Sequence, residues 1–429
     1  MGYIGLPLIA AFASRGCQML GIDVDKKKIQ KLKKTYKTDI YEPGVNDALA
    51  RYRKNIEFTS DYKKAVKECQ TILVTVGTPL KNNNQPDFSY LDNVVDMIGG
   101  ELLPGQLIMF KSTVMPGLTR KLAEKLEKKS KMKAGKDFYV VFCPERTVEG
   151  RALYELYNLP KIVGGISKES LERGAKIIKI LGGKVLKVSS LEIAEMCKCV
   201  DNVYRATNIA FGNEIGNICE KTGIDSYELA KAVNYTYPRT NLFLPGLGAG
   251  GPCLSKDPQI LKYFAHQNKV GTSVINASIE RNKSANLRVA FEALKFIKKN
   301  KIKNPKIVLL GVAFKGKPAT DDIRNSPALD VYQELKNKLK GASFTFYDPL
   351  TKYFAGNKVS KNLWQSVKGV NVAIFLTNHV DLIEIDAAKV LKEAGRPLLI
   401  VDCWHNLKNL EVLKEENIKI FRIGDNLKI

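Results

Sequence analysis

Histidine is scarce in this chain, and its cysteines show no paired spacing. Three histidines and eight cysteines occur among 429 residues, and no two cysteines form a Cys-x-x-Cys pair. Because zinc sites draw on clustered Cys and His ligands, no metal site is expected. Scattered thiols without an export signal indicate a reducing compartment, so we expect a cytoplasmic protein.

Long apolar runs and an N-terminal leader pattern are also absent. No segment approaches the roughly 18 apolar residues of a membrane span. The first residues lack a basic stretch followed by an apolar one. The chain has 429 residues and 45% hydrophobic content. This predicts two or three globular domains and no membrane insertion.

Acidic residues are outnumbered, but the excess of positive charge is diffuse. The chain holds 68 Lys and Arg against 44 Asp and Glu, a formal charge of +24. The lysines are scattered over runs such as Lys26 to Lys28 and Lys298-Lys299, without interleaved aromatics. This pattern is not typical of a nucleic-acid interface, so no nucleic-acid partner is expected. We interpret it as a lysine-rich surface that can attract an anionic small molecule.

Apolar β-type runs alternate with amphipathic helical runs in two parts of the chain, and the part between them is helical. This alternation is typical of a parallel sheet covered by helices. We expect an α/β domain over residues 1–190, an all-helical region over 191–300 and a second α/β domain over 301–429. The predicted strands are 19–23, 71–76, 107–110, 138–142, 307–311, 344–347, 372–376 and 398–401.

The chain opens with part of a dinucleotide-binding fingerprint. Gly2 and Gly5 match the second and third glycines of G-x-G-x-x-G, and Asp23 ends a predicted strand about 20 residues later. A carboxylate there accepts ribose hydroxyls and repels a 2′-phosphate, which favours NAD over NADP. The first glycine of the fingerprint and the strand before it are absent. We therefore expect that the first strand of the N-terminal domain is missing, which would weaken cofactor binding.

Three further loops follow predicted strands. Thr78, Thr113 and Glu145 each stand shortly after a β-type run. In an open α/β sheet the loops at the carboxyl ends of the strands line the ligand crevice. Ordinary turn chemistry explains the neighbouring Pro and Gly, so the hydroxyls of Thr78 and Thr113 and the Glu145 carboxylate are the candidate functional groups.

The segment from Gly248 to Asp257 ends a glycine-rich loop on a thiol. Glycine lets the backbone pass close to a ligand, and the loop leads to Cys253 with Lys256 and Asp257 just after it. A nearby ammonium favours the nucleophilic thiolate, and Asp257 could hold that ammonium or a base in place. The alternative is an inert cysteine in a helix-entry loop.

Two other segments carry charge at suggestive spacing. Lys198 and Asn202 are four residues apart on a predicted helix, and spacing alone favours a solvated face. Lys315 follows a strand and a glycine, with Arg324 further on. Both cations can pair with phosphate oxygens, so this segment is a candidate phosphate site.

Taken in order, these motifs resemble the UDP-glucose/GDP-mannose dehydrogenase family of nucleotide-sugar 6-dehydrogenases. The resemblance runs from Gly2 to about Asp402. Its most specific parts are residues 250–257, the Gly-Val-Ala-Phe-Lys segment 311–315 and the segment 321–327. It implies two Rossmann-like α/β domains joined by a central all-helical domain, and a homodimer formed through the helical part.

The resemblance also implies an NAD-dependent four-electron oxidation of a sugar C6 alcohol to a carboxylate. Cys253 would form a thiohemiacetal and then a thioester, which water hydrolyses. Lys198 and Asn202 would stabilise the oxyanion, in place of the solvated face that spacing favours. Asp257 would position or activate water.

Other roles follow from the same resemblance. Thr113 would help to order the water, and Glu145 would act as acid or base in thioester hydrolysis. The implied cofactor contacts are Gly2, Tyr3, Ile4, Gly5, Asp23, Thr78, Thr113 and Arg324. The implied sugar-nucleotide contacts are Glu145, Arg146, Lys198, Asn202, Arg239, Gly250, Gly251 and Lys315.

The residue after Glu145 bears on the choice of sugar. Glucose-type members usually have an aromatic residue there, whereas this chain has Arg146. The segment resembles members that act on UDP-N-acetylhexosamines, so UDP-N-acetylmannosamine is favoured, with UDP-glucose as the alternative. Two other classes stay open: a nucleotide-sugar-binding protein that lacks cofactor binding, and a hydroxyacid dehydrogenase, which would give Cys253 no role.

Overall fold

The computed structural model describes residues 1–413 and 417–425. Its contacts divide the chain into two compact units. Unit 1 comprises Met1–Asn202 and Gln259–Gly271, and unit 2 comprises Val203–Pro258 and Thr272–Ile429. Each unit is described in turn.

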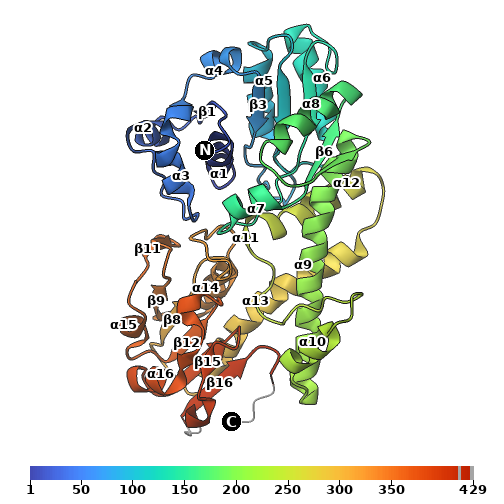
Figure 1. The fold of residues 1–429 in the computed structure, drawn as a ribbon. Helices are drawn as coiled ribbons and strands as arrows, with labels where there is room; N and C mark the ends of the chain where they lie inside the picture. Colours follow the sequence, from blue (N-terminus) through green and yellow to red (C-terminus); the bar gives the residue numbers. More distant parts are fainter. Residues whose placement is uncertain (414–416, 426–429) are drawn as a thin grey trace. The chain divides into compact units, whose positions relative to one another are not determined.

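Unit 1 contains two β-sheets. The strands are β1 (Met19–Ile22), β2 (Ile56–Thr59), β3 (Thr71–Val74), β4 (Leu107–Phe110), β5 (Tyr139–Phe142), β6 (Lys161–Gly165) and β7 (Val185–Val188). β1 and β2 form a parallel pair, and β3 to β7 form a five-stranded sheet in sequence order, parallel except between β5 and β6. No ladder joins the two sheets within the described ranges (Figure 1). That a first strand is missing stays a prediction.

Helix α1 is packed against both sheets of unit 1. Leu8 and Phe12 join the core cluster of β4 and β5, whereas Leu6 and Ile9 join the cluster of β2 and α2. Every residue of α1 is buried, because apolar side chains surround the whole helix. The helices of unit 1 before α9 are α1 (Gly5–Ala13), α2 (Lys26–Thr35), α3 (Val45–Arg51), α4 (Tyr62–Glu68), α5 (Ser89–Gly99), α6 (Leu118–Ser130), α7 (Ala152–Asn158) and α8 (Lys168–Lys179), with the short 3₁₀ helix η1 (Arg53–Asn55) after α3.

The middle of the chain is helical, as predicted. It contains α9 (Leu191–Thr222), α10 (Ser226–Asn234), α11 (Gly251–Leu254), α12 (Asp257–Gln267) and α13 (Ser273–Lys299). Of the helices in the described part of the chain, none combines the length and apolar character needed to cross a bilayer.

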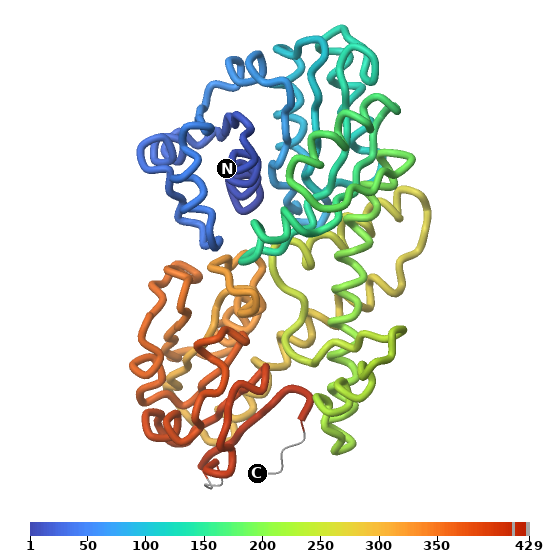
Figure 2. Tube along the Cα trace, in the orientation of Figure 1, coloured from blue at the N-terminus to red at the C-terminus, as the bar shows by residue number. Residues whose placement is uncertain are grey.

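The C-terminal part of unit 2 is a second α/β domain. Its strands β8 (Lys306–Leu310), β9 (Ser343–Tyr347), β12 (Val372–Phe375), β14 (Leu398–Asp402) and β16 (Ile418–Arg422) form a parallel sheet in the order β16-β14-β12-β8-β9. One face packs on α13 and α14 (Pro327–Lys338), and the other on α15 (Leu363–Val367) and α16 (Ala387–Glu393). The trace in Figure 2 shows yellow α13 running beside this orange-to-red domain.

Small elements connect the larger ones in this domain. They are β10 (Tyr353–Phe354), β11 (Asn357–Lys358), η2 (Val380–Leu382), β13 (Ile385–Asp386), β15 (Leu407–Lys408) and η3 (Leu410–Leu413). The predicted fold class, two α/β domains with a helical region between them, is confirmed. All eight predicted strands are present. The strands β2, β6, β7 and β16 and the two-residue strands β10, β11, β13 and β15 were not predicted.

Gly164 offers a test of how tightly unit 1 is packed. A Cβ at this position in β6 would lie 2.3 Å from the backbone oxygen of Ser190 and 3.0 Å from the Cβ of Ala194. We expect Gly164→Ala to lower the free energy of unfolding by about 2 kcal/mol, because backbone on that side leaves the methyl group no room. Urea unfolding measures this.

Gly100→Ala is the matched control, since a Cβ there would meet nothing within 4 Å and its φ of −75° suits alanine. It should be neutral or slightly stabilising. Equal effects of the two substitutions would contradict the packing described for β6.

Candidate active site

Three of the predicted loops meet at one edge of the five-stranded sheet. β3, β4 and β5 are parallel neighbours, so the loops that carry Thr78, Thr113 and Glu145 leave the same edge. The Thr78 hydroxyl donates to the backbone oxygen of Thr113 at 2.8 Å, and the Ser112 hydroxyl donates to that of Val76 at 2.7 Å. The first two loops are therefore tied together at this edge of the sheet, where the sequence predicted a ligand crevice.

Glu145 lies buried against an equally buried lysine. The ammonium of Lys111 is 3.4 Å from the Oε2 atom of Glu145 and donates to the backbone oxygen of Cys143 at 3.1 Å. The other carboxylate oxygen of Glu145 accepts the N–H groups of Arg146 and Thr147 at 2.9 and 3.0 Å. A buried charge needs such partners, because its hydration is lost.

These partners determine the charge state of Glu145. Burial alone would raise its pKa, but the ammonium groups of Lys111 and Lys161 and the Thr147 N–H lower the pKa to about 2. Burial likewise opposes the charge of Lys111, yet Cys143 and Glu145 raise the Lys111 pKa above its ordinary value. Glu145 is consequently a carboxylate, and Lys111 an ammonium, at neutral pH.

The segment after Glu145 is held by two contacts. The Arg146 guanidinium pairs with Asp201 of α9 at 2.8 Å. The buried carboxylate of Glu42 accepts the N–H groups of Gly150 and Ala152, both at 2.8 Å. This fixes the backbone that follows Glu145 on both sides.

Lys198 and Asn202 are both buried on α9, at 9% and 6% exposure. The solvated face that their spacing favoured is therefore wrong, because tertiary packing covers this side of α9. Glu195 precedes them on the same face of the helix. It is fully buried and accepts the N–H groups of Gly117 and Thr119 at 2.6 and 2.8 Å.

The start of α1 and the end of β1 provide the cofactor residues of the fingerprint. The N–H of Leu6 donates to the backbone oxygen of Gly2, which begins the first turn, and no side chain caps α1. A Cβ at Gly2 would meet nothing within 4 Å, so the backbone here is open to a ligand. Uncapped N–H groups at a helix start suit a pyrophosphate, so the residues present, Gly2 to Gly5, fit NAD.

Asp23 follows β1 as predicted. Its Oδ2 atom accepts from the Met1 ammonium at 2.6 Å and from Lys28 at 3.0 Å, and its Oδ1 atom accepts from the Asp25 N–H. Partial burial would raise the pKa of Asp23, but these hydrogen bonds lower it to about 2. An ionised acceptor of this kind suits ribose hydroxyls.

In unit 2 the glycine-rich loop lies in contact with its neighbours. A Cβ on Gly248 would meet the backbone oxygen of Asn282 at 2.0 Å, and one on Gly250 would meet Pro327 at 2.4 Å. Gly251 has φ of +83°, and its N–H donates to the backbone oxygen of Asn325 at 3.0 Å. Only glycine allows this close approach, which fixes the start of α11.

Cys253 lies on α11 and is exposed. The ammonium of Lys256 donates to the Oδ1 atom of Asp257 at 2.7 Å, and Asp257 is fully buried. Asp257 thus pairs with the ammonium of Lys256, and its role toward Cys253 stays a prediction.

The loop that carries Lys315 is packed against the cysteine loop. A Cβ on Gly251 would lie 2.6 Å from the ring of Phe314, the neighbour of Lys315. The buried Asp348 organises this loop, because its Oδ2 atom accepts the N–H groups of Val312 and Ala313 at 2.9 and 3.0 Å. Its Oδ1 atom accepts two further backbone N–H groups just after β9.

Two predicted arginines are less enclosed. Arg324 forms a bidentate pair with the buried Asp322, with a shortest distance of 2.6 Å. Arg239 is exposed in the loop after α10, with its guanidinium 4.7 Å from the ring centre of Tyr237.

Sequence reasoning gave no role to Lys111, Glu195 or Asp348. Each is a charged residue that directly follows a predicted strand or shares a helix face with a candidate residue. Those positions in the sequence could have indicated that the three residues matter. The N–H or carbonyl groups that each residue binds are distant in sequence, however, so the partners could not be predicted. The structure therefore brings the predicted residues together in two sets. Unit 1 holds Thr78, Thr113, Glu145, Arg146, Lys198 and Asn202, with Gly2, Gly5 and Asp23 at the first sheet; unit 2 holds Cys253, Asp257, Gly250, Gly251, Lys315, Arg324 and Arg239.

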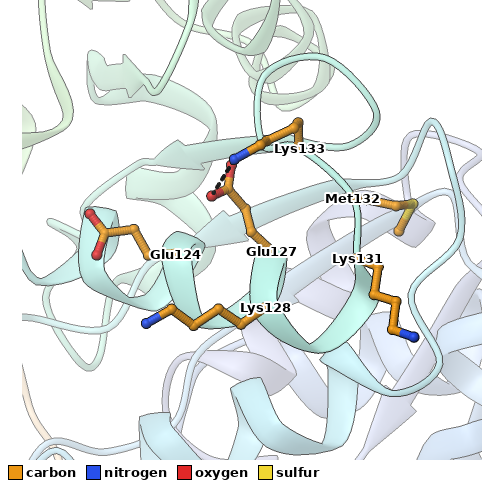
Figure 3. A pocket seen from close by; sticks show the side chains of 6 residues that line it. All are labelled: Glu124, Glu127, Lys128, Lys131, Met132 and Lys133. Carbon is orange, nitrogen blue, oxygen red and sulfur yellow. Dashed lines mark ion pairs between the residues drawn. The ribbon is translucent and has the colours of Figure 1, made fainter.

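A surface pocket elsewhere in unit 1 involves none of these residues. It lies at the C-terminal end of α6 and in the loop that follows (Figure 3). α6 begins at the carboxyl end of β4, so its far end lies at the opposite edge of the sheet. The pocket is lined by Glu124, Glu127, Lys128, Lys131, Met132 and Lys133. The exposed Lys133 pairs with the partly buried Glu127 at 3.7 Å beside the pocket, and we assign this pair no function.

Known proteins resemble this chain over almost its whole length. UDP-N-acetyl-D-mannosamine dehydrogenase of Pyrococcus horikoshii is 31% identical over 403 residues, which cover 93% of each chain. UDP-glucose 6-dehydrogenase TuaD of Bacillus subtilis is 30% identical over 433 residues, covering 99% of this chain and 91% of that protein. The solved structure of UDP-D-ManNAc dehydrogenase from Pyrococcus horikoshii superposes with a TM-score of 0.88 at 29% identity, covering 99% of this chain and 98% of that one.

Three family models match in order along the chain. The NAD binding domain of the UDP-glucose/GDP-mannose dehydrogenase family matches residues 1–181, its central domain 192–284 and its UDP binding domain 308–409. The predicted family and the NAD cofactor are thereby confirmed. The chain belongs to the UDP-glucose/GDP-mannose dehydrogenase family and is an NAD-dependent nucleotide-sugar dehydrogenase.

Proposed function

We propose that this protein oxidises the C6 alcohol of a UDP-N-acetylhexosamine, with UDP-N-acetylmannosamine as the favoured substrate, to the uronate. The observation that carries the proposal is Cys253, an exposed thiol at the end of a glycine loop packed against Phe314, next to Lys315. A covalent role suits this thiol, because a thiolate is a strong nucleophile and the thiol is accessible. NAD, when bound, accepts a hydride in each of two successive oxidations.

The first oxidation converts the C6 alcohol to an aldehyde. The Cys253 sulfur then adds to the aldehyde carbon to give a thiohemiacetal, and loss of a second hydride leaves a thioester. Water attacks the thioester, and the carbon–sulfur bond breaks to release the carboxylate and the thiol. Lys198 and Asn202 donate to the oxygen on which charge develops. Their burial supports this role, since donors are most effective when they are preplaced away from bulk water.

Hydrolysis of the thioester needs an oriented water. We assign its positioning to Thr113, Glu145 and Asp257. Because the pKa of Glu145 is about 2, its carboxylate is ionised at neutral pH and is a hydrogen-bond acceptor for water. The buried Asp257 holds the Lys256 ammonium near the same loop as Cys253. Both carboxylates therefore serve as fixed acceptors.

The sugar nucleotide is assigned to unit 2 and to the segment after Glu145. Lys315, Gly250 and Gly251 would receive it, with Arg239 contributing from the loop after α10. Arg324 is proposed to approach the cofactor. The chain is 31% identical to a UDP-N-acetyl-D-mannosamine dehydrogenase and 30% identical to a UDP-glucose 6-dehydrogenase, so sequence identity does not distinguish the two sugars. Arg146 supports the N-acetylated one, because a guanidinium donates well to an amide oxygen.

The stoichiometry of NADH tests the proposal. We expect two NADH to form per molecule of UDP-N-acetylmannosamine when the sugar is limiting. The absorbance of NADH measures this. UDP-N-acetylglucosamine and UDP-glucose should be oxidised more slowly. Cys253→Ala should lower the rate of acid formation roughly a thousandfold or more, because the thioester cannot form. Cys69→Ala, at a partly exposed cysteine of unit 1, is the control. One NADH per sugar, or UDP-glucose as the best substrate, would refute the mechanism or the sugar, respectively.

The charge state of Glu145 predicts a pH effect on stability. Its pKa is about 2 in the fold, against roughly 4.3 in an unfolded chain. The ionised form therefore stabilises the fold above about pH 5, and this contribution is lost as the pH falls toward about 2. We expect the wild-type free energy of unfolding to fall more steeply over that range than that of the double variant Lys111→Met, Glu145→Gln.

The control is the exposed pair of Lys64 and Glu57, 3.6 Å apart. Replacing it by Met and Gln should leave the pH slope unchanged, because exposed pairs contribute little. Urea unfolding at several pH values gives the slopes. Equal slopes for the wild type and the Lys111/Glu145 double variant would show that Glu145 is not held ionised by Lys111.

We also propose a homodimer formed through α9. In unit 2 this helix exposes Tyr204, Phe211 and Ile218, seven residues apart, at 60%, 54% and 52%. A long apolar stripe of this period suits packing against a second copy of the same helix. A cytoplasmic location is part of the proposal, since the reaction needs a reduced thiol at Cys253.

Light scattering tests the dimer. Phe211→Lys should shift the protein toward the monomer, because it places a charge in an apolar interface. Tyr90→Lys, at a 55% exposed aromatic of α5, should leave the mass unchanged. A wild-type monomer, or an unchanged dimer in Phe211→Lys, would count against an interface at this stripe.

A further inference from the structure

The buried carboxylate of Glu195 joins two elements of the candidate active site. It lies on α9, three residues before Lys198 and seven before Asn202, so all three share one side of the helix. Its two oxygens accept the N–H groups of Gly117 and Thr119 at 2.6 and 2.8 Å. These groups belong to the start of α6, which directly follows the loop that carries Thr113.

The start of α6 needs this carboxylate. Gly117 stands at the N-cap position with φ of +85° and has no side chain with which to cap the helix. Glu195 supplies the missing acceptor from another helix, and its negative charge suits the positive end of the α6 dipole. An alternative cap within the same segment is not present in the structure.

A second contact fastens the same loop to the same helix. The Cys199 thiol, one helical turn after Glu195, donates to the backbone oxygen of Val114 at 3.4 Å. Val114 directly follows Thr113. The loop is therefore attached to α9 at both of its ends, by Cys199 near Thr113 and by Glu195 at Gly117.

We propose that Glu195 is a positioning residue of the oxidation, which fastens the Thr113 loop to α9 so that Thr113, Lys198 and Asn202 keep one arrangement. This rests on the roles assigned above to those three side chains. Glu195 itself contacts backbone N–H groups and acts on the reaction only through its neighbours.

The attachment depends on the ionised form of Glu195. Burial raises its pKa to about 7, although the Thr119 and Gly117 N–H groups oppose the rise. A protonated carboxyl has one oxygen that carries hydrogen, so it accepts from the two N–H groups less well. The charged groups around it are Glu192 on α9, whose carboxylate adds to the rise, and Arg120 on α6, which is bonded to Glu192 at 2.7 Å. Half of the Glu195 carboxyls are therefore protonated at about pH 7, so the attachment is complete roughly one pH unit higher and weakens as the pH falls through about 7.

Steady-state kinetics of Glu195→Gln against pH tests the proposal. We expect kcat to fall about tenfold, as for loss of one charge-assisted hydrogen bond. The KM for the UDP-sugar should change less than kcat, since the proposed sugar-nucleotide contacts Lys315, Gly250 and Gly251 lie in unit 2 and are not held by Glu195. The decline of kcat below about pH 7 in the wild type should disappear in Glu195→Gln, and it should remain in Glu195→Asp, which keeps a carboxylate.

Glu192→Gln is the matched control, since Glu192 lies on the same helix and pairs with Arg120. It should keep kcat above neutral pH. Because the Glu192 carboxylate adds to the rise of the Glu195 pKa, the decline of kcat should persist in Glu192→Gln but begin at a lower pH. Amide hydrogen exchange at Gly117 and Thr119 provides a readout without substrate: Glu195→Gln should exchange faster there at pH 8, at an unchanged melting temperature.

The outcomes separate the two hypotheses. A wild type that makes no NADH from any UDP-sugar would refute the proposed function, and the exchange rates would still decide whether Glu195 fastens the loop. If Glu195→Gln kept the kcat of the wild type and its decline below about pH 7, the positioning role would be overturned. The role would also be overturned if Glu195→Gln and Glu195→Asp lost kcat and folded protein to the same extent, because a purely structural residue behaves in that way.

Discussion

Buried carboxylates that accept backbone N–H groups hold the loops of this protein in place. Glu42 holds the segment after Glu145, Glu195 holds the start of α6, and Asp348 holds the loop before Lys315. A buried carboxylate without partners would cost several kcal/mol. Each such loop is consequently fixed to the segment that carries its carboxylate, and so are the candidate functional groups on the loop.

Much of the fold could be predicted because its central strands are apolar runs. Segments such as Leu107–Phe110 are short, continuously apolar and buried on both faces, which is typical of a central parallel strand. The strands that escaped prediction are weaker in pattern. β6 ends in two glycines, which lower β propensity, and half-exposed β7 contains a lysine. Their pairing partners, not their composition, make them strands.

The candidate site was predictable where it depends on position along the chain. Glu145, Thr113 and Asp23 follow strands, and a strand end fixes where a residue lies. Lys198 and Asn202 show the limit, because helical spacing says which residues share a face but not what covers it. Glu195 and Asp348 bind N–H groups 76 and 36 residues away, respectively, and no local pattern reports such pairs.

Asp23 and Asp348 stand at equivalent points of the two α/β domains, each directly after a parallel strand. Asp348 spends both oxygens on four N–H groups of its own domain. Asp23 accepts from one backbone N–H group and from the ammonium groups of Met1 and Lys28. The carboxylate of Asp348 is thus occupied by backbone N–H groups, whereas that of Asp23 is bound mainly by ammonium groups. The same position after a parallel strand organises a loop in one domain and carries the proposed ribose contact in the other.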